Sequence, residues 1–196
     1  MSHNTWAHRF VGVFVRPLAR TPVTPNQITA LRLATGIAAA AALATGALHV
    51  GAALWLLSML CDRADGILAR LTGKITPWGH RFDLISDFLA TGLLFFGLGA
   101  GLRHSGFGDW ALAMGVAAGL SVCLIFWLVQ VIDKLLPGDT AAVPSAAGFD
   151  ADDTLFVVAP LIWLGWAEEF LIVAAIGAPI ALVVTMLALW RLARRA

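Results

Sequence analysis

The chain has 196 residues, of which 60% are hydrophobic and 13% are charged, and its formal net charge is +1. Its mean hydropathy of +0.85 is far above the range of an ordinary soluble domain, and the near-neutral charge excludes a general attraction to nucleic acid. Cys61 and Cys123 lie far apart in apolar surroundings, so neither a disulfide nor a zinc site is indicated. The composition predicts an all-α integral membrane protein.

Residues 1–24 predict an amphipathic helix that lies on the membrane surface. Trp6, Phe10 and Phe14 recur at helical spacing, while Arg9 falls among the polar positions. The arginines are spread through the segment, and they do not fit a cleavable signal peptide. Two prolines, before residue 26, then interrupt the pattern. A loosely ordered leader is the alternative interpretation.

Residues 25–196 predict one membrane domain with six transmembrane helices. A span needs about 20 predominantly apolar residues, so this length leaves no room for a separate soluble domain. The apolar runs place the spans near 26–47, 50–71, 77–102, 109–136, 153–166 and 170–192. The loop over 137–152 is interpreted as solvated, and a cover over the active site is the alternative.

The basic residues predict the orientation of these spans. Every Lys and Arg except Arg103 falls at or near one end of the six predicted helices. By the positive-inside rule that end is cytoplasmic, and both termini lie there. We therefore expect a protein of the prokaryotic inner membrane whose substrates arrive from the cytoplasm.

Four aspartates lie in segments apolar enough to cross a membrane, namely Asp62, Asp65, Asp83 and Asp87. Each central carboxylate opposes insertion by roughly 2.5–3.5 kcal/mol, so the group needs cations. Spacings of three and four residues place each pair on one helix face. A set of oxygen ligands favours Mg²⁺ or Mn²⁺, and a two-metal site suits displacement at phosphorus.

The aspartates belong to a longer pattern, Asp62-x-x-Asp65-Gly66-x-x-Ala69-Arg70, followed after eight residues by Gly79-x-x-x-Asp83-x-x-x-Asp87. The pattern resembles the signature of the CDP-alcohol phosphotransferase family, and the run from Pro25 to Arg32 resembles the family's segment before its first membrane helix. The resemblance implies transfer of a substituted phosphate from a CDP-linked donor to an alcohol hydroxyl, with release of CMP. It also implies a role in phospholipid biosynthesis and a homodimer.

Carried over by position, the resemblance also implies the roles of single residues. The metal ligands would be Asp62, Asp65, Asp83 and Asp87, and the CDP site would be shaped by Gly66, Ala69, Arg70 and Gly79. Asp87 matches the general base, and the alternative is that it mainly positions the alcohol. Asn26 either orients the nucleotide or caps the first span. Arg32 either reaches a phosphate or extends to the lipid headgroups.

Several alternatives stay open at this point. The favoured donor is CDP-diacylglycerol with a small polar alcohol as acceptor, and the alternative is a soluble CDP-alcohol that donates to a lipid hydroxyl. Cations around the pattern either bind a phosphate on the acceptor or orient the loop on anionic lipid; they are Arg63, Lys74, His80 and Arg81. A divalent-cation transporter is the interpretation from another class. It needs a polar route through the opposite half of the bilayer, where only Arg103, Asp109, Glu168 and Glu169 are charged.

Overall fold

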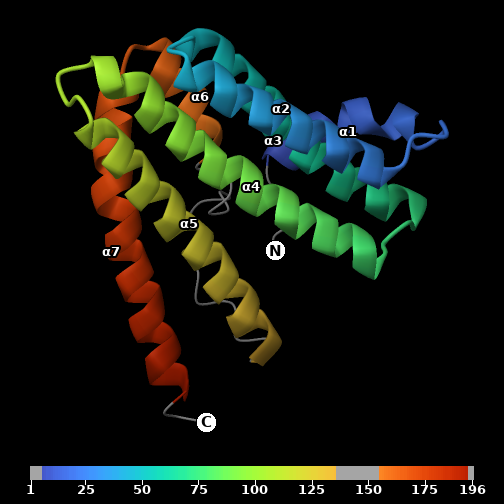
Figure 1. Ribbon diagram of the computed structural model, residues 1–196. Coiled ribbons are helices and arrows are strands. Elements are labelled where there is room, and N and C mark those ends of the chain that lie inside the picture. The colour runs from blue at the N-terminus through green and yellow to red at the C-terminus, as the bar shows by residue number, and fades with distance from the viewer. Residues whose placement is uncertain (1–5, 136–154, 194–196) are drawn as a thin grey trace.

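The computed structural model describes residues 6–135 and 155–193, and all regular structure in these ranges is helical (Figure 1). The elements are α1 (Trp6–Leu18), α2 (Pro25–Ala44), α3 (Leu48–Thr72), α4 (Pro77–Gly101), η1 (Leu102–His104), α5 (Trp110–Leu135), α6 (Val158–Trp163) and α7 (Ala167–Ala193). The all-α prediction is confirmed for these residues. The loop predicted over 137–152 lies outside them.

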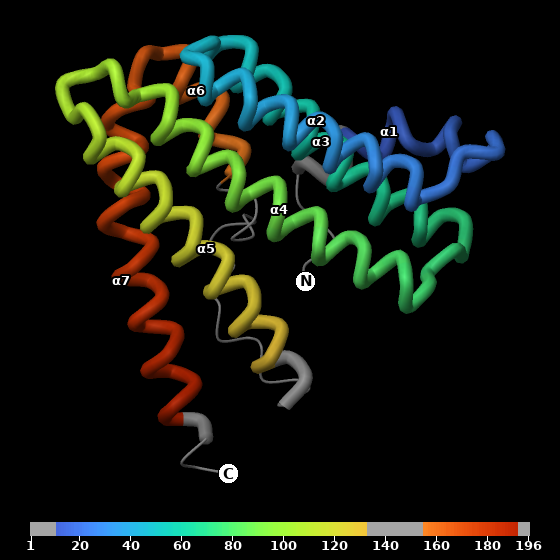
Figure 2. The backbone as a smooth tube through the Cα atoms, in the orientation of Figure 1, coloured from blue at the N-terminus to red at the C-terminus, as the bar shows by residue number. Residues whose placement is uncertain are grey.

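The helices form two connected groups (Figures 1 and 2). In the first group, α2 packs against both α3 and α4, and α1 and α6 pack against α3. In the second group, α5 packs against α4 and α7 packs against α5. Because α2 packs against both α3 and α4, it lies between the two helices that carry the sequence pattern.

Local sequence signals set the ends of the helices around this region. Before α2, the backbone N–H of Thr24 donates to the side chain of Gln27 at 2.9 Å, which fixes the first turn. Gly73 ends α3 in the left-handed conformation, with φ of 67°. Thr76 then caps α4 by accepting a hydrogen bond from the backbone of Gly79 at 3.0 Å. The short connection keeps the end of α3 close to the start of α4.

Glycines allow α4 to approach its neighbours closely. A Cβ atom at Gly97 would overlap the backbone carbonyl oxygen of Ala40 on α2, and one at Gly101 would overlap that of Leu43 on the same helix. A Cβ atom at Gly115 on α5 would likewise overlap the carbonyl oxygen of Phe95. These small-residue spacings therefore serve contacts within the chain. The homodimer stays a prediction.

The main core lies between α2, α3, α4 and α6, and the first turns of α5 and α7 join it. Trp55, Leu94 and Leu98 are completely buried there. The indole Nε1 of Trp55 donates to the carbonyl oxygen of Leu155 at 3.0 Å. A second cluster joins α1 to α3 through Val11 and its neighbours. A helix, α1, thus lies within the first 24 residues and packs on α3, whereas its amphipathic role at a membrane surface stays a prediction.

Four helical segments in the described residues are long and apolar enough to cross a membrane, namely Pro25–Ala44, Pro77–His104, Trp110–Ile132 and Ala167–Arg191. The helix α3 has 25 residues but is not one of these four segments. It carries charged residues of the sequence pattern, among them Asp62, Asp65 and Arg70. In the predicted fifth span only α6 is a regular α-helix, and its six residues reach roughly 9 Å. A bilayer core is about 30 Å thick. The prediction of six spans is not confirmed by these residues.

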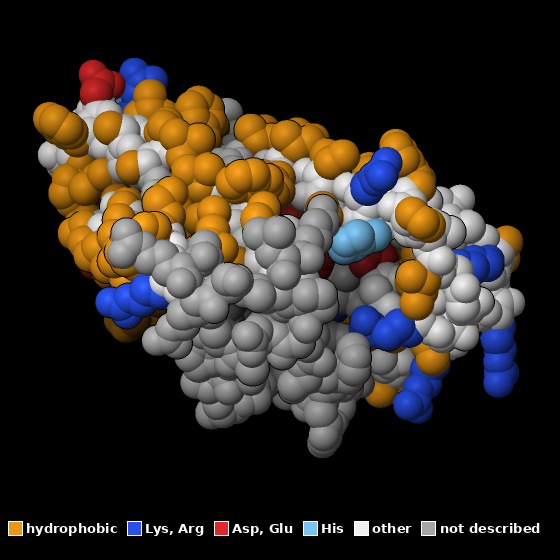
Figure 3. Space-filling view, turned by 90° about the horizontal axis from the view of Figure 1, so that it is seen from below, with side chains coloured by type: hydrophobic (Ala, Val, Ile, Leu, Met, Phe, Trp, Pro, Cys, Tyr) orange, Lys and Arg blue, Asp and Glu red, His pale blue; other side chains and the backbone are white. Residues whose placement is uncertain are grey.

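Polar and apolar surfaces are separated on the face that Figure 3 shows. Apolar side chains cover much of the end formed by α5 and α7, where α7 exposes Val173, Ile176, Val183 and Leu187. Most Lys and Arg side chains gather at the other end, next to a hollow in which acidic side chains are visible. An exposed apolar helix of this kind fits contact with lipid. The protein is an integral membrane protein.

Candidate functional site

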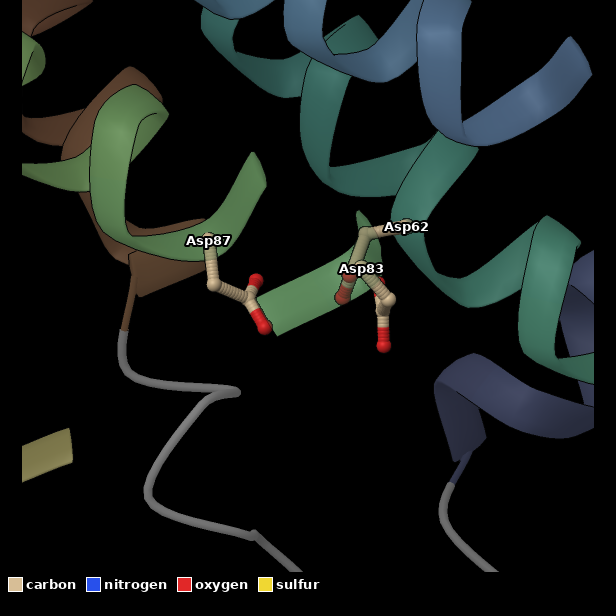
Figure 4. A group of neighbouring side chains, drawn as sticks. All are labelled: Asp62, Asp83 and Asp87. Atoms are coloured by element: carbon tan, nitrogen blue, oxygen red, sulfur yellow. The ribbon is translucent and has the colours of Figure 1, made fainter. Parts of the chain in front are cut away.

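Three of the four predicted acids converge. Asp62 projects from α3, whereas Asp83 and Asp87 project from successive turns of α4, and Figure 4 shows their carboxylates directed into one space. A carboxylate oxygen from each lies within 4.8 Å of the other two. All three side chains are only partly buried. Three carboxylates at this distance repel one another unless a cation lies between them.

Arg32 supplies a positive charge to this space from α2. Its Nε lies 3.2 Å from Oδ1 of Asp62 and its Nη1 lies 3.5 Å from Oδ1 of Asp83. Its Nη2 forms an ion pair and hydrogen bond with Asp87. The residue is only 2% exposed. The sequence allowed two roles for Arg32, contact with a phosphate or extension to the lipid headgroups. In the structure its side chain is directed into the protein, so it does not extend to the headgroups.

The backbone of α2 is held at the same position. Oγ of Ser58, on α3, donates to the backbone carbonyl oxygen of Arg32 at 2.9 Å. One turn later, a Cβ atom at Gly36 would come within 2.8 Å of the Cβ atom of Ala90 on α4. The guanidinium therefore extends from a backbone that is fixed against both helices that carry the acids. Neither Ser58 nor Gly36 was singled out from the sequence.

Asp65 is placed differently from the other three acids. It is 5% exposed, and its Oδ2 accepts a hydrogen bond from Oγ1 of Thr29 on α2 at 2.6 Å. It is not one of the three residues whose oxygens converge. The sequence grouped it with Asp62 as a metal ligand, and that role stays a prediction. Thr29 was missed because only the packing of α2 on α3 brings it to Asp65.

Replacing Thr29 with valine should lower the free energy of unfolding by about 1–3 kcal/mol, because the buried carboxylate of Asp65 loses its donor. The measurement is thermal unfolding in detergent, followed by tryptophan fluorescence. The matched control is Thr35→Val, since within the described residues Oγ1 of Thr35 bonds to carbonyl oxygens of its own helix alone. Equal losses in the two variants would show that the Thr29–Asp65 bond does not matter for stability.

The residues that the family resemblance assigns to the nucleotide lie at the same end of the three helices. A Cβ atom at Gly79 would lie 3.0 Å from both Oδ1 of Asn26 and Oγ1 of Thr76, so Asn26 contacts the first turn of α4. A Cβ atom at Gly66 would lie 3.6 Å from Nη2 of Arg70, which places that guanidinium beside the glycine. Ala69 lies in the last turn of α3. The structure thus brings these five residues near the acids.

A further contact fixes the chain after residue 154 against the site. The guanidinium carbon of Arg63 lies 5.9 Å from the centroid of the Phe156 ring. Together with the bond from Trp55 to Leu155, this attaches the segment before α6 to α3. Arg63 directly follows Asp62 in the chain. Sequence reasoning did not single out Phe156, since an isolated phenylalanine in an apolar run carries no signal.

The sequence model of the CDP-alcohol phosphatidyltransferase family matches residues 22–190. The chain belongs to this family. The matched range includes all of the acids, Arg32 and every residue assigned above to the nucleotide. The resemblance drawn from the sequence pattern is therefore confirmed.

Three curated relatives of this family member share part of its sequence. It is 40% identical over 88 residues to the bifunctional IPC transferase and DIPP synthase of Rubrobacter xylanophilus, over 44% of the chain and 20% of that protein. It is 35% identical over 89 residues to the archaetidylinositol phosphate synthase of Methanothermobacter thermautotrophicus, over 45% of the chain and 46% of that protein. It is 34% identical over 109 residues to the inner membrane protein YnjF of Escherichia coli, over 55% of the chain and 52% of that protein. The chain spans at most about half the length of these relatives.

A solved structure supports the fold of this family member over nearly its whole length. The crystal structure of Mycobacterium tuberculosis phosphatidylinositol phosphate synthase (PgsA1) with CDP-DAG bound superposes with a TM-score of 0.73 at 20% identity. The superposition covers 93% of the chain and 94% of PgsA1. The apo form of PgsA1 gives a TM-score of 0.55 over 82% of the chain. At this identity the similarity establishes the fold alone.

Proposed function

We propose that this protein transfers a phosphatidyl group from a CDP-linked donor, such as CDP-diacylglycerol, to the hydroxyl of a small polar alcohol, and that it releases CMP. The main support is the convergence of Asp62, Asp83 and Asp87 within 4.8 Å, at the end of the helices that carries the residues assigned to the nucleotide by resemblance. The family match supports the reaction class. The soluble CDP-alcohol with a lipid acceptor is the alternative pair of substrates.

The residues at the site fit a divalent metal ion. The three carboxylates offer oxygen ligands, and Arg32 balances only one of their three negative charges. Hard oxygen ligands with residual negative charge suit Mg²⁺ or Mn²⁺. When such ions are bound, the chemistry they supply is stabilisation of negative charge on the pyrophosphate oxygens. We propose that Asp62, Asp83 and Asp87 hold them, with Asp65 as a fourth ligand.

The chain's own residues then have distinct tasks. Gly66, Ala69 and Gly79 leave space for the donor, and Arg70 offers a planar set of N–H donors to a phosphate. Asn26 orients the nucleotide. We assign Asp87 as the base that takes the proton of the acceptor hydroxyl.

The reaction exchanges one phosphorus–oxygen bond for another. The acceptor oxygen forms a bond to the phosphorus that carries the lipid. The bond from that phosphorus to the bridging oxygen of the pyrophosphate breaks, and CMP leaves with the bridging oxygen. The hydroxyl proton passes to the carboxylate.

The substrates are proposed from the relatives and from the surface of the site. PgsA1 was crystallised with CDP-DAG, which supports a CDP-linked lipid as donor here. One relative is named as an archaetidylinositol phosphate synthase, which supports a phosphorylated alcohol among the acceptors to be tested. Cations around the sequence pattern support the same acceptor class, and they are Arg63, Lys74, His80 and Arg81. They would contribute by pairing with its phosphate.

Purified protein should release CMP from CDP-diacylglycerol when Mg²⁺ or Mn²⁺ and the correct alcohol are present, and excess EDTA should lower the rate at least about a hundredfold. The panel of donors includes CDP-choline and CDP-ethanolamine, and the panel of alcohols includes inositol phosphate, glycerol phosphate and serine. Added Mg²⁺ after EDTA is the control and should restore the rate. Undiminished turnover in EDTA would refute metal dependence, and Mn²⁺ flux into liposomes without CMP release would favour the transporter.

We also propose that the protein is a homodimer in a prokaryotic inner membrane, with both termini and the acids on the cytoplasmic side. The clustering of Lys and Arg at one end supports this orientation. Labelling of an introduced cysteine with an impermeant maleimide in intact cells tests the side. The mass of the protein in detergent, corrected for bound detergent, tests the dimer.

A further inference from the structure

Arg32 is a cation that the chain itself places inside the acid group. Its three guanidinium nitrogens face three different carboxylates, at 3.2 Å for Asp62 and 3.5 Å for Asp83 and as a direct ion pair for Asp87. A side chain that is 2% exposed does not exchange these partners for water. The guanidinium therefore lies where a cation held jointly by these three acids would lie.

The charges at this position limit how many divalent ions the acids accept. The four acids proposed as ligands carry four negative charges and Arg32 balances one of them, so one divalent ion leaves a net charge of −1. A second divalent ion would make the group positive. That state is costly, because the first ion and Arg32 both repel the second ion. An anion that arrives with the second ion removes the cost.

We propose that Arg32 occupies one of the two cation positions in the nucleotide-free protein, so that the free protein holds one divalent ion and takes up the second together with the CDP pyrophosphate. This inference rests on the metal-dependent function proposed above. Arg32 is then a positioning residue, which keeps Asp62, Asp83 and Asp87 together before the donor arrives. When the donor binds, its pyrophosphate is an alternative partner for the guanidinium, because a planar fork of N–H groups fits a phosphate.

The inference explains why an arginine is held so firmly at this point of α2. Its backbone carbonyl oxygen is bonded by Ser58 on α3 at 2.9 Å. A residue that only anchored the helix at a lipid surface would need exposure at the headgroups, and Arg32 has almost none. A residue that only bound the donor would not need ion pairs with three acids.

Counting bound Mn²⁺ by electron paramagnetic resonance, on detergent-purified full-length protein, tests the proposal. The wild type should bind one Mn²⁺ per chain without nucleotide and a second when CDP is added. Arg32→Gln should bind the second Mn²⁺ without CDP, with an affinity for that ion at least about tenfold above that of the wild type. Arg32→Lys keeps the charge and should remain at one ion. Arg103→Gln, which removes a guanidinium paired with Asp109 beyond the far end of α4, is the matched control and should also remain at one.

The outcomes separate this inference from the proposed function. Two Mn²⁺ ions in the nucleotide-free wild type would overturn the role of Arg32 and leave the two-metal enzyme intact. The same holds if CDP adds no ion, or if Arg32→Gln binds Mn²⁺ as the wild type does. Failure of the wild type to bind Mn²⁺ with or without CDP would refute the proposed metal site itself. If Arg32→Gln does not fold, the wild-type counts still test the proposal. Two ions without CDP, or no added ion with CDP, would contradict it.

Discussion

Replacing Asp83 or Asp87 with asparagine is expected to lower CMP release by at least about a thousandfold, while the protein still inserts and folds. Asparagine keeps the size of the side chain and removes the negative charge, and both residues lie in the group of three that converges within 4.8 Å. The loss at Asp87 has a second cause, because the acceptor hydroxyl also loses the proposed base. The measurement is CMP release by purified protein at saturating Mg²⁺.

A matched control lies beyond the opposite end of α4. Asp109→Asn removes a carboxylate whose side chain is 90% exposed and which pairs with Arg103 at 3.1 Å. An exposed pair of this kind contributes little to stability, so this variant should retain full activity. Wild-type turnover in Asp83→Asn or Asp87→Asn would contradict the proposed site. Loss of activity in Asp109→Asn as well would show that any lost carboxylate disturbs the protein.

The convergence of these acids was predictable because it depends on short-range geometry. Residues Asp83 and Asp87, four apart, must lie on one face of a helix, and Asp62 lies about three turns before the end of the preceding helix. Only residues 73–76 connect those helices, so their adjoining ends stay close. Spacing and connection length together therefore predict the group before any packing is known.

The packing of α2 was not predictable in the same way. Thr29 and Arg32 are three residues apart on α2 and face different acids, Asp65 and the converging group. Nothing in the local pattern fixes the rotation of α2 about its axis, since that rotation depends on contacts such as the close approach of Gly36 to Ala90. The acids of the site are therefore easier to predict from the sequence than the side chains of α2 that bind to them.

The number of membrane spans was difficult to predict for a different reason. The apolar run over 153–166 has the composition of a buried segment, and it is shorter than the length that crosses a bilayer. Within it the structure has the short α6, whose Ile162 is almost completely buried in the main core. Apolar composition alone does not separate a segment that packs inside a membrane protein from one that spans the lipid.

The arrangement of the acids depends on how closely α4 approaches α2, so Gly97→Ala is expected to destabilise the protein by at least about 3 kcal/mol. A methyl group at this position overlaps the backbone carbonyl oxygen of Ala40, which no rotamer change can move. The control is Gly177→Ala in α7, where a Cβ atom meets nothing within 4 Å. That variant should be neutral or more stable by about 0.5–1 kcal/mol, since alanine favours a helix more than glycine does.

Thermal unfolding in detergent, followed by tryptophan fluorescence, measures both variants. Opposite signs are expected from the same chemical change, because Gly97 contacts a backbone and Gly177 faces open space. A Gly97→Ala protein as stable as Gly177→Ala would mean that α2 and α4 are farther apart than described. Arg32 would then lie farther from Asp83 and Asp87, because α2 carries the guanidinium and α4 carries those two acids. The stability of one methyl variant at Gly97 therefore tests the helix contact on which the geometry of the proposed active site rests.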